Sequence, residues 1–117
     1  MNYWMDHDLK KISGDAPAYP EHAIESWLAL PVPATEDKWK AVTGRFSWLL
    51  AELATLADSD GEKLDGVIRD AGSQPRESTV REMVMQISAH NSYHAGQIAL
   101  LRRQCGAWPP RRGGDSW

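Results

Sequence analysis

The chain has 117 residues, of which 42% are hydrophobic and 25% are charged, and its net charge is -3. This length allows one domain with one core, and the acidic balance argues against nucleic acid as the main partner, because phosphate binding normally needs a basic face. The single cysteine, Cys105, excludes an internal disulfide and fits a reducing compartment, and no apolar run approaches the ~20 residues of a membrane span. We therefore expect a single cytoplasmic domain over residues 1–117, without a membrane partner.

The first predicted element is a helix over residues 1–12. Met5, Leu9 and Ile12 share one side of it, and Gly14 follows as a stop signal. No cap precedes this helix, so it has the pattern of the second half of a longer one. Residues 14–34 are rich in proline and predict a connector with one short helix, from Pro20 or Glu21 to Leu28, held on the core by its aromatic side chains.

A second helix is predicted to begin after Thr35, whose hydroxyl can cap it. Apolar residues then recur in steps of three and four, which is typical of a helix packed along its neighbours. These seam positions are Trp39, Val42, Phe46, Leu49, Leu53 and Leu56. The segment 61–78 predicts an irregular loop with Leu64, Val67 and Ile68 packed against the core.

The last predicted helix begins at Thr79, which forms a capping box with Glu82, and it runs to about Cys105, where Gly106 ends it. Without strand-like alternation anywhere, the sequence predicts an all-α bundle of three long helices and a Pro-rich connector.

Two histidines, His90 and His94, stand four residues apart on this last helix. Four residues make about one turn, so both imidazoles lie on one face, which the apolar pattern predicts to be buried. Its lane is Met83, Ile87, His90, His94, Gln97 and Leu101, with Val80, Val84, Asn91, Ile98 and Cys105 beside it. The spacing suits two nitrogen ligands for one divalent metal ion, but it equally suits two hydrogen-bonded core histidines.

A metal site would need at least a third ligand from another helix. The candidates in this chain are His7, Asp6 and Asp8, with His22 a weaker one, since a surface histidine is expected in the connector. Asn91 stands where a metalloprotease helix would carry its glutamate base, so that motif is absent.

Several motifs together resemble the DinB/YfiT-like superfamily. They are the run from Ser78 to Met83, the pattern His90-x-x-x-His94-x-Gly96-Gln97-Ile98, the run from Leu100 to Arg103, the segment from Gly106 to Pro110, and the end from Gly113 to Trp117. The resemblance is strong over residues 78–117. It is weaker upstream, at Tyr3-Trp4, Ser26-Trp27 and Trp39.

The resemblance implies a four-helix bundle, commonly homodimeric, with a divalent metal ion bound by three histidines. Two of them map onto His90 and His94, whereas the third would fall at or just before Met1. The family's first helix also has no counterpart, so we expect a chain that is N-terminally truncated or a member that has lost part of the site. His7 is the only local substitute, about two turns or ~10 Å along the helix from the expected position.

The resemblance also implies an activity. Members of the superfamily include transferases and isomerases that use low-molecular-weight thiols. We therefore expect a zinc- or nickel-dependent S-transferase or hydrolase that acts on a small molecule with a thiol cosubstrate. Its pocket would be lined by Asn91, Tyr93 and Gln97, unless these residues serve only in packing. The alternative is a non-catalytic, stress-related homodimer with an incomplete or vestigial metal site.

Overall fold

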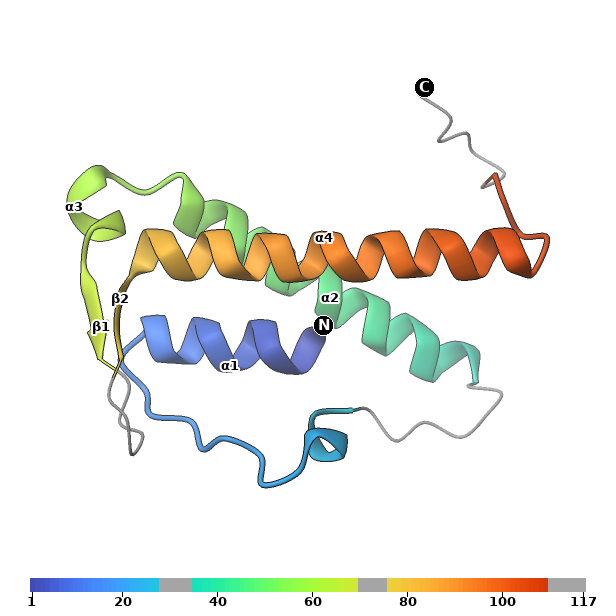
Figure 1. The fold of residues 1–117 in the computed structure, drawn as a ribbon, viewed down its shortest axis with the longest axis horizontal. Coiled ribbons are helices and arrows are strands. Elements are labelled where there is room, and N and C mark those ends of the chain that lie inside the picture. Colours follow the sequence, from blue (N-terminus) through green and yellow to red (C-terminus); the bar gives the residue numbers. More distant parts are fainter. Residues whose placement is uncertain (28–34, 70–75, 110–117) are drawn as a thin grey trace.

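The computed structural model describes residues 1–27, 35–69 and 76–109. Three long helices dominate these residues, and the connector carries a single turn of 3-10 helix (Figure 1). The elements are, in chain order, α1 (Asn2–Ile12), the 3-10 helix (Ala23–Ser26), α2 (Glu36–Ala57), α3 (Gly61–Leu64), β1 (Val67–Arg69), β2 (Glu77–Thr79) and α4 (Val80–Gln104). The predicted class, a helical bundle with three long helices and a connector, is confirmed.

Both predicted caps start their helices. The Thr35 side chain accepts a hydrogen bond from the Lys38 backbone N–H at the start of α2. At the start of α4, Thr79 and Glu82 form the reciprocal capping box, with the Thr79 backbone N–H donating to the Glu82 carboxylate at 2.7 Å. Each cap satisfies backbone donors that a helix leaves unpaired in its first turn, so the sequence defines both starting points locally.

The core lies where the three long helices meet. Met5 of α1, Leu49 and Leu53 of α2 and Ile87 of α4 form its centre, and Met5 and Leu49 are almost completely buried. A second cluster, of Leu56, Leu64 and Val80, joins the end of α2 to α3 and to the start of α4. α1 is the shortest of the three and lies alongside α4, so it covers only the first part of that helix (Figure 1).

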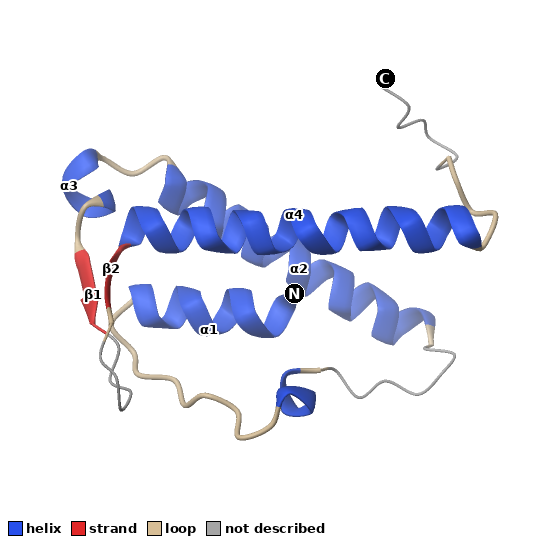
Figure 2. Cartoon of the chain, viewed as in Figure 1, coloured by secondary structure: helices blue, strands red, loops and turns tan. Residues whose placement is uncertain are grey.

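The segment between α2 and α4 corrects the predicted irregular loop. Asp60 caps the short helix α3 by accepting a hydrogen bond from the Lys63 N–H at 2.8 Å. β1 and β2 then pair as an antiparallel hairpin, with Val67 opposite Thr79 (Figure 2). Leu64 is buried as expected, whereas Val67 is 57% exposed, because alternate residues of a two-stranded ribbon face solvent.

The predicted burial is wrong at two tryptophans. Trp39, assigned to the seam of α2, is 61% exposed, because the buried part of that helix begins only near its middle. Trp27 is 73% exposed, so it does not hold the connector on the core. Among the described residues of the connector, Tyr19 is the aromatic whose ring contacts the core helices, where it meets Trp4 and His7. The predicted end of the connector helix, at Leu28, lies outside the described residues.

The second half of α4 also differs from prediction. Burial on this helix ends at Asn91, and the remaining lane residues Gln97, Ile98, Leu101 and Cys105 are all exposed. In the ranges that the structure describes, no helix combines the length and the apolarity needed to cross a membrane.

Candidate metal centre

The two histidines of α4 face each other across one helical turn. The Nε2 atoms of His90 and His94 are 3.1 Å apart, and their rings meet edge to face with centroids 4.5 Å apart. Both side chains are half-buried, at the point where α4 leaves the core. The predicted juxtaposition on one face is therefore present, although the face itself is only partly covered.

Gln97 orients the second imidazole. Its side-chain oxygen lies 2.8 Å from Nδ1 of His94. An amide oxygen only accepts, so Nδ1 of His94 donates its proton and, in the neutral ring, Nε2 carries the lone pair. This is the tautomer that a metal ligand needs on the side that faces His90, and a partner on the other ring nitrogen is what usually fixes it.

The surroundings of His90 favour the neutral form of its imidazole. Burial lowers the pKa of its imidazole, and the nearby His94 ring and the amino terminus lower it further, whereas Asp8 opposes them. A neutral imidazole has a lone pair to offer, so a lowered pKa favours the form of this side chain that can bind a metal ion.

The donor set fits part of a divalent metal site. Two histidine nitrogens that bind one zinc ion at about 2.0–2.1 Å lie about 2.8–3.4 Å apart for bond angles between octahedral and tetrahedral. The observed 3.1 Å falls within this range. Within residues 1–27, 35–69 and 76–109, however, no group of three or more His, Cys, Asp or Glu side chains is arranged to hold an ion. The pair therefore fits as two ligands of a site whose third member stays a prediction.

His7, the substitute third ligand, is buried on α1. It is only 4% exposed and packs against the rings of Tyr3, Trp4 and Tyr19, with centroids 4.7–6.2 Å away. Its Nδ1 lies 3.3 Å from Asp8, and its Nε2 has no hydrogen-bond partner among the described residues. The expected alternative, a polar histidine flanked by two aspartates, underestimates this burial; the role of His7 as a ligand stays a prediction.

Two of the remaining candidates, Asp6 and Asn91, are engaged elsewhere. Asp6 pairs with Lys10 and Arg45, which together lower the pKa of its carboxyl, Lys10 most of all. His22 is exposed at the start of the connector turn, as expected. Asn91 is buried and donates from Nδ2 to the Met5 sulfur at 3.0 Å, which supports a packing role.

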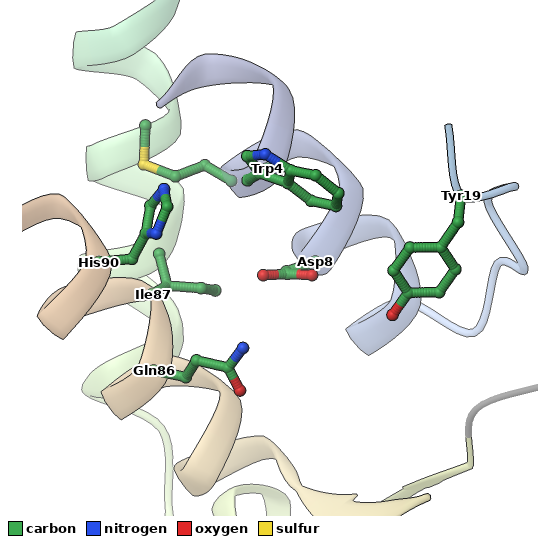
Figure 3. A pocket seen from close by; sticks show the side chains of 7 residues that line it. Trp4, Asp8, Tyr19, Gln86, Ile87 and His90 are labelled. Atoms are coloured by element: carbon green, nitrogen blue, oxygen red, sulfur yellow. The ribbon is translucent and has the colours of Figure 1, made fainter. Parts of the chain in front are cut away.

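A cavity of about 280 Å³ opens beside His90 (Figure 3). Its lining comes from α1, α4 and the connector: Trp4, Met5, Asp8, Tyr19, Gln86, Ile87 and His90. None of the predicted lining residues, Asn91, Tyr93 and Gln97, belongs to it. The sequence motifs do not assign Trp4 or Gln86 to a site. Their spacing could have indicated it, because each stands four residues before a candidate ligand on the same helical face, Trp4 before Asp8 and Gln86 before His90.

The comparisons with known proteins agree with these motifs. The family model described as DinB family matches residues 24–113, which is more than three quarters of the chain and includes both histidines of α4. α1, with His7, lies before the matched region. No curated protein and no solved structure matches the chain.

Proposed function

The chain belongs to the DinB family, and on that premise we propose that it binds a divalent metal ion, zinc or nickel, with His90 and His94 as two of the ligands. The observation that carries this proposal is the 3.1 Å separation of the two Nε2 atoms, one helical turn apart. The same contact is also a hydrogen bond between the two imidazoles, so metal content is the measurement that separates a ligand pair from a hydrogen-bonded pair.

We propose further that the site serves a metal-dependent transfer of a low-molecular-weight thiol, or a hydrolysis, on a small substrate. A bound divalent ion supplies Lewis-acid chemistry there, because it favours the thiolate over the thiol and hydroxide over water. The cavity beside His90 supports this reading, since it gives a small molecule room next to one of the two donors.

The residues of this chain supply orientation around the donors. Gln97 holds the His94 ring by its Nδ1 proton, and burial favours the neutral form of His90. Met5, 1% exposed, lies on the inner side of the cavity and is packed in the core, so this wall excludes water. A cytoplasmic location is part of the proposal, because Cys105 has no cysteine partner in the sequence.

Metal content tests the proposal directly. We expect wild-type protein, equilibrated with zinc or nickel and then dialysed, to retain close to one ion per chain by elemental analysis. His90→Ala and His94→Ala should each lose it, because removal of one of few ligands sharply weakens a site. The matched control is His22→Ala, which removes an exposed imidazole. Loss of the ion in His7→Ala, with the helical circular dichroism unchanged, would support His7 as the third ligand.

The opposite result is equally clear. Metal-free wild-type protein after this treatment, together with an unchanged melting temperature on addition of zinc or nickel, would exclude the metal site and the thiol chemistry with it.

A second candidate is a non-catalytic homodimer with an incomplete metal site. Its support is the exposed apolar surface on the second half of α4, where Tyr93, Ile98, Leu100 and Leu101 are each about half exposed or more. Apolar surface of this kind commonly marks an interface. Light scattering on wild-type protein and on Leu101→Glu tests the dimer, because a dimer through this surface should dissociate in the variant, whereas a protein that is monomeric already will not change. The metal content measured above then decides whether such a dimer lacks the ion.

A further inference from the structure

The cavity beside His90 carries an acidic group whose role the metal proposal leaves open. Asp8 lies on its α1 wall, between Trp4 and the α4 residues that close the opposite side (Figure 3). The Asp8 side chain is only 18% exposed. A partly buried carboxylate gains stability from a partner, because burial of a charge is costly unless the charge is paired.

The neighbouring aspartate on the same helix shows what a paired carboxylate looks like here. Asp6 forms ion pairs with Lys10, at 2.8 Å, and with Arg45. For Asp8, by contrast, the part of the chain that the structure describes provides no lysine or arginine partner, only Nδ1 of the neighbouring His7 at 3.3 Å. The two carboxylates differ in this respect although they are two residues apart, and only Asp8 faces the cavity.

Besides the polar side chains of Gln86 and His90, the other walls of the cavity are aromatic and apolar. The Trp4 and Tyr19 rings stand 6.3 Å apart between centroids. Lys11 already engages Tyr19, since its Nζ donates to the Tyr19 hydroxyl at 3.0 Å, so Trp4 is the aromatic wall that remains for a ligand cation. Met5 and Ile87, 1% and 3% exposed, supply an apolar surface.

We propose that this cavity binds a small amphipathic amine, with Asp8 pairing with its ammonium group, Trp4 contributing a cation–π contact, and Met5 and Ile87 receiving its apolar body. A carboxylate beside an aromatic face is the combination that recognises an organic cation, because both groups favour positive charge and neither can satisfy an anion. Binding itself does not depend on a metal ion. That the amine is the substrate of a centre at His90 and His94 rests on the proposed function.

The first test compares three ligands that differ only in their charged end: 2-phenylethylamine, 2-phenylethanol and phenylacetate. Amide chemical shifts of isotopically labelled protein, followed during titration at pH 8, report binding and its location. We expect the amine to bind about tenfold more tightly than the alcohol, with the largest shifts around Asp8 and Ile87, and phenylacetate to bind most weakly. Equal binding of amine and alcohol, or preferred binding of phenylacetate, overturns the proposal whatever the variants show.

The second test removes the charge without changing the shape. Asp8→Asn should weaken 2-phenylethylamine about tenfold and leave 2-phenylethanol unchanged. Asp6→Asn is the matched control, because it makes the same change on the same helix away from the cavity, and it should bind the amine as wild type does. Wild-type affinity in Asp8→Asn contradicts the proposal.

Repeating the titration with chelator-treated and with zinc-equilibrated protein separates the two proposals. Amine binding in both preparations, with no retained zinc, would refute the metal site alone. Retained zinc without preference for the amine would refute the amine site alone.

Discussion

The two halves of α4 carry the same helical spacing of apolar residues but lie in different surroundings. In the first half, Val80, Met83 and Ile87 are less than 10% exposed, because α1, α2 and the segment around α3 pack against them. In the second half, Ile98 and Leu101 are 49% and 58% exposed. Periodicity therefore identifies which residues share a face, whereas burial depends on a neighbour that the pattern cannot supply.

The histidine pair lies where the buried half of α4 meets the exposed half. Asn91, between the two imidazoles, is the last buried residue of the helix. A metal site in this position would have one donor against the core and the other toward solvent.

Removing one core side chain should have the largest effect. Ile87→Ala should lower the free energy of unfolding by about 2–4 kcal/mol, because it leaves a cavity among Met5, Leu49 and Leu53. Leu101→Ala should change it by less than about 0.5 kcal/mol. Urea unfolding followed by circular dichroism measures both. Equal losses would mean that the second half is covered in solution, by a second copy of the chain or by another segment.

Gln97 is exposed, yet we expect it to affect the metal site. Gln97→Ala should weaken zinc or nickel binding by about tenfold or more, because the His94 ring loses the partner that sets its tautomer. Gln104→Ala, also exposed and at the end of the same helix, should retain wild-type affinity. Calorimetric titration measures the metal affinity of both variants, and equal affinities would refute an orienting role for Gln97.

Two hydroxyl groups, one at the N-cap of α4 and one in its second half, should also differ in their contribution to stability. Thr79→Ala should cost about 1 kcal/mol of unfolding free energy, since the capping box and its backbone partners are lost. Ser92→Ala removes only a hydroxyl that donates back to the Ser88 carbonyl inside the helix, so its effect should stay within about 0.5 kcal/mol. If the two substitutions cost the same in thermal unfolding, the cap is not what fixes the start of α4.

The smallest effect should be a pH dependence. Because the pKa of His90 is lowered in the folded state, the unfolded chain binds its proton more readily. The stability that neutral His90 contributes is therefore complete above the unfolded value of about 6.5 and is lost as the pH falls from there toward the folded pKa. In metal-free protein, His90→Gln should reduce the fall in unfolding free energy between pH 7.5 and 5.5, and an unchanged fall would place its origin in other groups.

The features that sequence predicted are those that local chemistry decides. Thr35 and Thr79 mark helix starts because a cap acts within one turn. His90 and His94 lie on one face because of helical geometry alone. The sequence does not predict the hairpin, because the strands Val67–Arg69 and Glu77–Thr79 are too short to show an alternation of apolar and polar residues.

The rest of the site depends on contacts that spacing does not encode. Asp8 and His90 line the same cavity although 82 positions separate them in the chain, and only the packing of α1 on α4 brings them together. The exposure of Trp39 has the same origin, since an apolar seam predicts burial only where another helix reaches it.

The unequal lengths of the helices have a consequence for motion. α4 has 25 residues and α1 has 11, which makes them about 37 Å and 16 Å long, so more than half of α4 extends past the helix beside it (Figure 1). Amide hydrogens in the buried half should exchange with deuterium only as the whole domain opens, whereas those beyond Asn91 should exchange through fraying of a few turns. α4 should thus behave as two segments of different protection, and an ion that bridges His90 and His94 should slow exchange first in the turn between them.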